Sequence, residues 1–330
     1  MKTYRTLLLV TVAMAFCLIV LGAYVRLSDA GLGCPDWPGC YGQVSVIHAS
    51  EHISAAQEAN PSGPVTFAKA WKEMIHRYFA GIVGLCILSI AVLAWRNRRD
   101  SAASPLLATA LIGVVALQAM FGKWTVTMLL KPAIVTGHLI GGLTVLGLLV
   151  CLYARTLAPS RQSAGSSLRL FAALAFVVLA AQISLGGWVS TNYAALACSD
   201  LPTCRGALVP DMDIRNGFHI VRELGVDAEG ATLTIEALTA IHWMHRVGAI
   251  IAVLVLGALG FALRRAGYTA LGTVLLAVLT CQFMLGLANV WFSLPLPVAA
   301  AHNGGAAALV ILLVLINYRV RASRSNAIPE

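Results

Sequence analysis

The feature that most constrains this chain is a series of about eight apolar runs, each roughly 20 residues long and able to cross a lipid bilayer. Charged residues make up only 11% of the 330 residues, whereas soluble domains have about a quarter. Helices are favoured for such runs because unpaired backbone groups are costly in lipid. The sequence therefore predicts an all-α membrane protein with eight transmembrane helices, at about 6–26, 74–95, 104–123, 133–154, 168–190, 238–262, 269–291 and 298–318.

The net charge of +9 does not indicate nucleic-acid binding, because the distribution of the basic residues along the chain indicates how the protein is oriented in a membrane. Basic residues gather before the first run and in short connections between runs: Lys2, Arg5, Arg96, Arg98, Arg99, Arg155, Arg161, Arg264, Arg265, Arg319, Arg321 and Arg324. This positive-inside pattern predicts that both termini are cytoplasmic and that two long loops, about 27–73 and 191–237, lie outside. The first run lacks a small-residue cleavage site, and no transit segment is recognisable, so we expect a multi-pass protein of a bacterial plasma (inner) membrane.

The chain repeats itself at an offset of about 164 residues. Its outer loops carry matching cysteine pairs, and Gln118 to Gly122 matches Gln282 to Gly286. Each half begins and ends on the same side, which indicates a parallel repeat. We therefore expect two repeated four-helix bundles, one in residues 1–160 and one in residues 161–330.

The outer-loop cysteines are expected to form two short-range disulfides. Each pair encloses a segment with a proline, and prolines favour a turn that brings two thiols together. The outer compartment is oxidising, so thiols there tend to pair. The predicted bonds join Cys34 to Cys40 and Cys198 to Cys204.

Four histidines, one near the outer end of every second helix, carry the chemistry. A histidine within a membrane span is costly and therefore suggests a function. Each half contributes two, and paired imidazoles across a bundle suit axial ligation of haem iron. Zinc would need three or four ligands in each site. We therefore expect two haem sites, with iron ligands His76, His138, His245 and His302. The glycines after His138 and His302 would let a flat macrocycle approach the backbone.

One difference separates the two sites. Glu73 precedes His76 by three residues, whereas His242 precedes His245, and this spacing puts each pair on one helix face. A carboxylate beside a reacting group can move protons or stabilise positive charge. We therefore assign chemistry, with Glu73 as the catalytic residue, to the N-terminal site and a resident redox haem to the C-terminal site. Arg77 and Arg246 could pair with haem propionates.

A third pattern, His48-x-x-Glu51-His52, matches a zinc-peptidase motif. It lies in an outer loop with no clear apolar helix pattern and no third ligand, so we do not interpret it as a metal site.

Together, the four histidines, Glu73-x-x-His76-Arg77, the duplicated four-helix pattern and the loop cysteines resemble the haem A synthase family, whose members oxidise haem O in cytochrome oxidase assembly. The resemblance covers nearly the whole chain. It implies an oxidoreductase that converts the C8 methyl group of haem O into a formyl group by successive hydroxylations. It also implies that His245 and His302 ligate a haem b cofactor and that His76 and His138 bracket the substrate haem. Haem O synthase and cytochrome oxidase assembly factors are the partners it suggests, besides membrane lipid.

Two alternatives remain open from the sequence. A dihaem b membrane cytochrome, passing electrons between quinol and an outer partner, would use the same histidine pairs. A membrane thiol oxidoreductase would use the loop cysteines instead.

Overall fold

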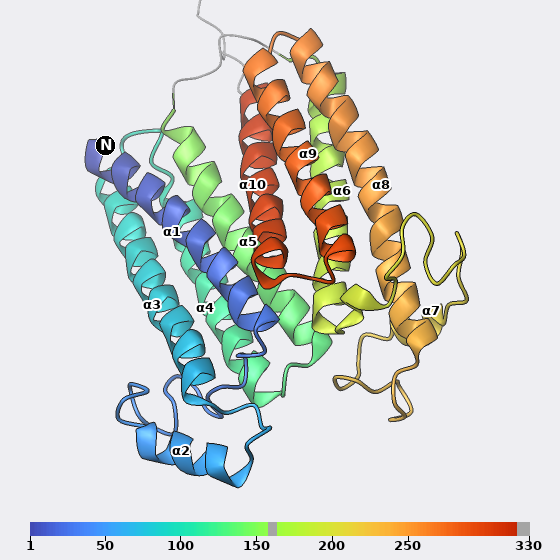
Figure 1. Cartoon of the computed structure of the whole chain (residues 1–330). Helices are drawn as coiled ribbons and strands as arrows, with labels where there is room; N and C mark the ends of the chain where they lie inside the picture. The colour runs from blue at the N-terminus through green and yellow to red at the C-terminus, as the bar shows by residue number, and fades with distance from the viewer. Residues whose placement is uncertain (158–163, 322–330) are drawn as a thin grey trace, which may run out of the picture.

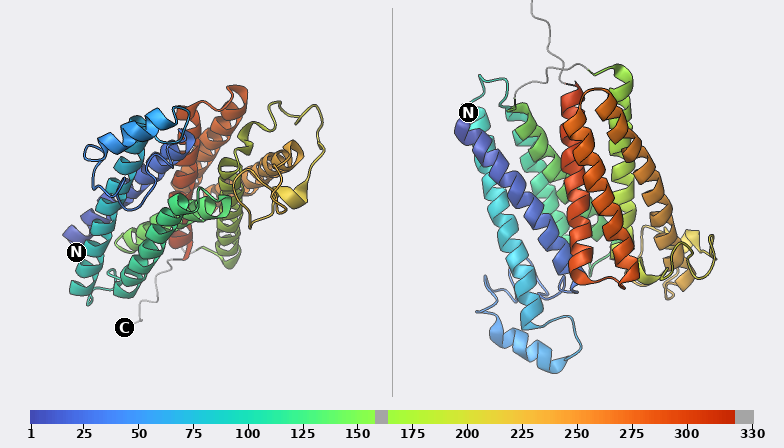
Figure 2. Two further views of the ribbon diagram at one scale, coloured as in Figure 1. Left: turned by 90° about the horizontal axis from the view of Figure 1, so that it is seen from below. Right: turned by 45° about the horizontal axis from the view of Figure 1, so that its top comes forward.

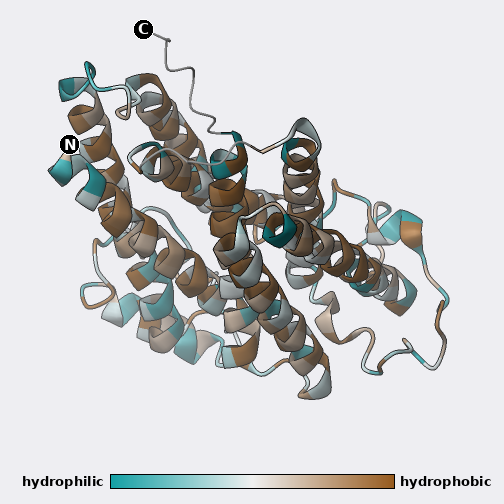
Figure 3. Cartoon of the chain, turned by 90° about the horizontal axis from the view of Figure 1, so that it is seen from above, coloured by the Kyte–Doolittle hydropathy of each residue, from teal (hydrophilic) through white to brown (hydrophobic). Residues whose placement is uncertain are grey.

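The computed structural model describes residues 1–157 and 164–321, and over these ranges it contains helices and no strand apart from isolated β-bridges (Figure 1). Eight helices of the described ranges are long and apolar enough to cross a membrane. They are α1 (Lys2–Leu27), α3 (Phe67–Arg96), α4 (Pro105–Thr127), α5 (Pro132–Arg155), α6 (Ser166–Thr191), α8 (Ile235–Arg265), α9 (Thr269–Trp291) and α10 (Leu296–Arg321). The predicted all-α membrane fold is thereby confirmed. Apolar residues run along the helices, and hydrophilic residues gather at helix ends and in loops (Figure 3).

The eight helices form two rings of four. In the N-terminal ring, α1 and α4 each contact both α3 and α5. In the C-terminal ring, α6 and α9 each contact both α8 and α10. The rings meet through α1 with α10, α5 with α6, and α5 with α10, and they lie beside each other in Figures 1 and 2. These contacts do not conflict with the two predicted four-helix bundles. The predicted boundary at 160/161 lies outside the described residues, as do Arg161 and Arg324.

Polar contacts join the two rings near one end. Arg26 Nη2 donates a hydrogen bond to the carbonyl oxygen of Ser190 over 2.8 Å, and Tyr193 Oη donates to Asp29 Oδ1 over 2.9 Å. The two residues of each pair are 164 positions apart, which is the offset of the sequence repeat. Each of these residues therefore contacts its own counterpart in the other ring.

The two long loops lie at the end of the bundle opposite the N-terminus (Figure 1). They contain short helices that the sequence pattern did not indicate: α2 (Ser50–Ala59), a 3-10 turn (Ala194–Leu196) and α7 (Ile214–Gly217). All three have fewer than four turns, too short to show a clear apolar period.

Helices α3 and α8 begin earlier than predicted, at residues 67 and 235 rather than 74 and 238. In each, a threonine caps the N-terminus: Thr66 Oγ1 accepts from the Lys69 N–H, and Thr234 Oγ1 accepts from the Ala237 N–H, both over 3.2 Å. With 30 and 31 residues, these helices are about 45 Å long, which exceeds the roughly 30 Å hydrocarbon core. Their first turns therefore extend among the loops and hold the loops in place.

Candidate functional site

The four predicted ligand histidines occupy equivalent positions in the fold. Each imidazole packs against a glycine of the preceding membrane helix, at the site where a Cβ atom would lie 2.9–3.3 Å from the ring atom Cε1. The pairs are His76 with Gly22, His138 with Gly122, His245 with Gly186 and His302 with Gly286. Any larger residue at these glycines would displace the imidazole. Each glycine therefore leaves space for one imidazole.

The histidines are paired within each ring. His76 on α3 and His138 on α5 belong to the N-terminal ring of helices, and His245 on α8 and His302 on α10 belong to the C-terminal ring. The Nδ1 atoms of His76, His138 and His302 are buried and have no hydrogen-bond partner among the described residues. Two imidazoles in each ring of helices, three of the four with an unpartnered Nδ1 atom, fit a haem held by axial ligation. The four iron ligands and the haems stay predictions.

The glycines that follow two of these histidines do not face an open space in this structure. A methyl group at Gly141 or Gly305 would overlap the side-chain oxygen of Gln118 or Gln282, respectively. We expected these glycines to let a flat macrocycle approach the backbone, but glutamine side chains occupy the space beside Gly141 and Gly305. They make room for a carboxamide that reaches across from the neighbouring helix.

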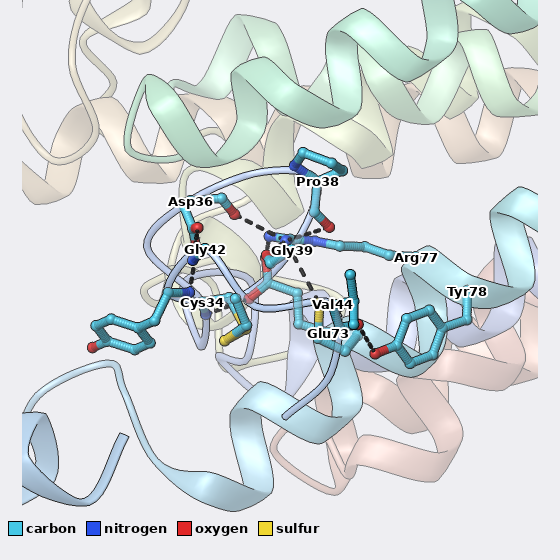
Figure 4. The surroundings of a disulfide bond; sticks show 12 residues. Cys34, Asp36, Pro38, Gly39, Gly42, Val44, Glu73, Arg77 and Tyr78 are labelled. Atoms are coloured by element: carbon cyan, nitrogen blue, oxygen red, sulfur yellow. Dashed lines mark hydrogen bonds and ion pairs between the residues drawn. A yellow bond between two sulfur atoms is a disulfide. The ribbon is translucent and has the colours of Figure 1, made fainter. Parts of the chain in front are cut away.

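Glu73 is buried, with 5% of its surface exposed, and both of its carboxylate oxygens are engaged (Figure 4). Oε2 accepts a hydrogen bond from the Cys34 N–H over 2.9 Å, and Oε1 pairs with Arg77 Nη2 at 2.5 Å. Arg77 Nη1 in turn donates to the carbonyl oxygens of Asp36 and Pro38, at 2.9 and 3.3 Å, and to that of Gly39. Together, Glu73 and Arg77 bind the first disulfide loop, residues 34–43, to the outer part of α3.

His242 and Arg246 hold the second disulfide loop, residues 198–207, in the matching way. Arg246 donates to the carbonyl oxygens of Cys198, Asp200 and Thr203 over 2.6–2.9 Å. The Cys198 N–H and Arg246 Nε each lie 3.3 Å from a different ring nitrogen of His242. A neutral imidazole accepts a hydrogen bond at only one nitrogen, so His242 satisfies one of these donors at a time, whereas the Glu73 carboxylate satisfies both of its own.

The arginines therefore bind the disulfide loops in this structure. The sequence suggested haem propionates as partners of Arg77 and Arg246, and that role stays a prediction. The loop contacts could not be found from sequence because they join segments about 40 residues apart.

Both predicted disulfides are present, Cys34–Cys40 with a Cα–Cα distance of 5.0 Å and Cys198–Cys204 with 4.7 Å. Each bond closes a loop that ends in a tight turn, where Cys40 pairs with Gln43 and Cys204 with Ala207 through the backbone.

Two aspartates that the sequence reasoning missed organise these turns. Asp36 accepts hydrogen bonds from the Tyr41 and Gly42 N–H groups, and Asp200 does so from those of Arg205 and Gly206. The Thr203 hydroxyl and these N–H groups hold the pKa of the Asp200 carboxyl well below its usual range. Their common place, two residues after the first cysteine of each loop, was the available signal.

The zinc-peptidase-like pattern spans the start of α2. His48 Nδ1 lies 2.7 Å from Ser45 Oγ, and the His52 ring stacks on Tyr41 at 5.7 Å. The described residues contain no group of three or more His, Cys, Asp and Glu side chains that could hold a metal ion.

Comparison with known proteins identifies the family. The model of a family described as "Cytochrome oxidase assembly protein" matches residues 5–314. A "Heme A synthase" of Shewanella oneidensis is 43% identical over 94% of this chain and 95% of its own length. Proteins of the same name from Rhodospirillum centenum and Bradyrhizobium diazoefficiens are 27% and 28% identical, over 95% and 97% of this chain and 87% and 92% of their own lengths. The chain thus belongs to the family of cytochrome oxidase assembly proteins that includes these heme A synthases.

Proposed function

We propose that this protein is a haem A synthase, an oxidoreductase that converts the C8 methyl group of haem O into the formyl group of haem A. Two successive hydroxylations of the methyl carbon would give a geminal diol, which loses water to leave the aldehyde. The observation that carries the proposal is the combination of two equivalent histidine pairs with a buried carboxylate, Glu73, three residues before a histidine of only one of them. The similarity to heme A synthases along nearly the whole chain supports the same conclusion.

The two rings would divide the work. His245 and His302, in residues 161–330, would hold a resident haem b, and His76 and His138, in residues 1–160, would hold the substrate haem. The difference between the two halves supports this division: the N-terminal half has a carboxylate, Glu73, at the position where the C-terminal half has an imidazole, His242. When bound, haem b would supply one-electron redox chemistry.

Glu73 would serve the reaction as a fixed negative charge. Both carboxylate oxygens already accept hydrogen bonds, from Cys34 and Arg77, so the group holds its place three residues before His76. A carboxylate in this position stabilises positive charge that develops on a bound substrate. For Glu73 to take up a proton, one of these two contacts would have to break.

A pair of variants separates this chemistry from the structural role of Glu73. Glu73→Gln keeps an oxygen that can accept from the Cys34 N–H but removes the charge, whereas Glu73→Ala removes both. If the charge acts in the reaction, both variants keep haem b and stop producing haem A. Normal haem A output from Glu73→Gln would show that Glu73 only anchors the loop.

The protein would reside in a bacterial inner membrane with both termini in the cytoplasm. Arginines at the ends of α3, α5, α8 and α10 support this orientation, since they lie at the ends opposite the long loops (Figure 1). Haem O synthase and cytochrome oxidase assembly factors are the proposed partners, in addition to membrane lipid.

The near-equivalence of the two histidine pairs favours a second candidate, a dihaem b cytochrome that passes electrons between quinol and an outer partner. The haems extracted from protein purified out of cells that make haem O decide between the two. Haem A or hydroxylated haem O in the extract is the expected result. Two haem b groups with no haem A, even after haem O is supplied, would favour the cytochrome.

A further inference from the structure

Three of the four histidines have a glutamine beside them. Gln118 Nε2 donates to the backbone oxygen of His138 over 2.7 Å. Gln182 Nε2 lies 3.0 Å from both the backbone oxygen and the ring Nδ1 of His245. Gln282 Nε2 lies 3.4 Å from a ring nitrogen of His302. Each glutamine stands four residues before the glycine on which the same imidazole packs.

A second glycine makes room for each glutamine. It lies three residues after the histidine, and a methyl group there would overlap the carboxamide oxygen of Gln118, Gln182 or Gln282. The three positions are Gly141, Gly248 and Gly305. A glutamine and a glycine on one helix, with a histidine and a glycine on the next, thus form a unit that occurs three times.

His76 is the exception. It packs on Gly22 as the other histidines pack on their glycines, but Leu18 and Phe79 stand where the other sites have glutamine and glycine. The two replacements belong together, since leucine has no carboxamide and so needs no glycine on the neighbouring helix to make room for one. What sets His76 apart is the missing glutamine, since its buried, unpartnered Nδ1 atom is shared with His138 and His302 among the described residues.

Each of the three glutamines has a side-chain oxygen that could still accept a hydrogen bond. The side-chain oxygens of Gln118, Gln182 and Gln282 are all buried without a partner in the described part of the chain. Gln182 and Gln282 lie at ring nitrogens, so a half-turn of either carboxamide would present this oxygen to an imidazole N–H, for Gln182 at the cost of its hydrogen bond to the His245 backbone oxygen. Gln118 instead holds His138 through its backbone oxygen. A hydrogen bond from the outer ring nitrogen fixes the orientation of a ligand histidine and makes it a stronger donor to a metal.

Resting on the function proposed above, we propose that the three glutamines are positioning residues for iron ligands and that His76 is the ligand that releases the substrate haem. The resident haem would then have two supported ligands, His245 and His302. The substrate haem would have one, His138, and its iron bond to His76 would break as product leaves and form again with the next haem O. The exchangeable haem is thus assigned to the site that lacks one glutamine.

The first test removes a glutamine from the resident site of the full-length protein in detergent. Gln182→Met keeps the approximate length of the side chain but cannot bond the imidazole. Transfer of the resident haem to excess apomyoglobin should become about ten- to a hundredfold faster. The midpoint potential of that haem should rise, since a weaker donor stabilises ferric iron less. Gln282→Met should change both quantities in the same direction, and Gln57→Met, an exposed position in α2, is the control.

The second test adds the missing unit to the substrate site. Leu18→Gln combined with Phe79→Gly should slow the transfer of haem O from the N-terminal ring about tenfold, with the resident haem unchanged. Unchanged potential and transfer rate in both Met variants would overturn the role of the glutamines. Equal transfer rates from the two rings of the unaltered protein would overturn the role of His76. If these shifts occur while no haem A forms, the ligand asymmetry stands and only the proposed function fails.

Discussion

Replacing Gly186 with alanine should separate haem binding from folding. The added Cβ would lie 2.9 Å from His245 Cε1, whereas ordinary contacts of this kind begin at 3.4 Å, so the ring would have to retreat by about 0.5 Å. The ring has little freedom to do so, because Gln182 lies 3.0 Å from both its Nδ1 atom and the backbone oxygen of the same residue. The substitution thus acts directly on a proposed iron ligand.

Two opposing free energies set the expected result. Forcing an extra carbon into a packed site costs about 1–3 kcal/mol, which corresponds to about a five- to 150-fold loss of haem affinity. Alanine in place of glycine within a helix favours folding by about 1 kcal/mol. Gly186→Ala should therefore lose haem from the C-terminal ring while the polypeptide still folds and inserts.

The assay measures the ratio of haem to protein by pyridine haemochrome absorbance, together with the thermal unfolding temperature. Gly113→Ala in α4 is the matched control, since a methyl group there meets no atom within 4 Å. Gly22→Ala, with the same 2.9 Å approach to His76, should spare the resident haem and affect only the substrate site. A Gly186→Ala protein with full haem content and an unaltered spectrum would refute the reasoning that the glycine reserves space for a ligand.

Three further substitutions test other parts of the structure. His245→Ala should lose haem b and much of the protein's stability, and an intact haem b spectrum would exclude this residue as a ligand. Arg77→Ala leaves Glu73 buried without its ion pair, at a cost of about 3–5 kcal/mol, and frees three loop carbonyl groups. A thiol-labelling assay should then detect faster reduction of the Cys34–Cys40 bond, with the Cys198–Cys204 bond as internal control. Cys34→Ser should keep part of the activity; complete loss with normal haem content would point to a thiol oxidoreductase.

The sequence predicted the features that a single segment or a repeat encodes. The eight spans follow from uninterrupted apolar runs, and the two disulfides follow from matching cysteine pairs in loops of like composition. The early start of α3 was missed because Lys69 and Lys72 interrupt the apolar pattern, although the helix continues through them to its cap at Thr66.

Contacts between helices could not be predicted in this way. Gln118 and Gln282 were visible as markers of the repeat, but their place beside His138 and His302 depends on which helices are neighbours. The sequence suggests a haem propionate as a partner of Arg77, because Arg77 follows a ligand histidine and a guanidinium matches a carboxylate. In the structure, loop carbonyl groups 38–41 residues away occupy its guanidinium, and no local pattern records their proximity.

The pairing of Arg26 with Ser190, and of Asp29 with Tyr193, has a consequence for how such a molecule can arise. Two identical subunits related by a twofold axis would place the same residue on both sides at each of these points. In one continuous polypeptide the counterparts are free to diverge. Here the Arg26 guanidinium bonds the backbone oxygen of Ser190 and stacks on the Tyr193 ring at 4.1 Å, and this ring contact exists because position 193 differs from its counterpart Asp29.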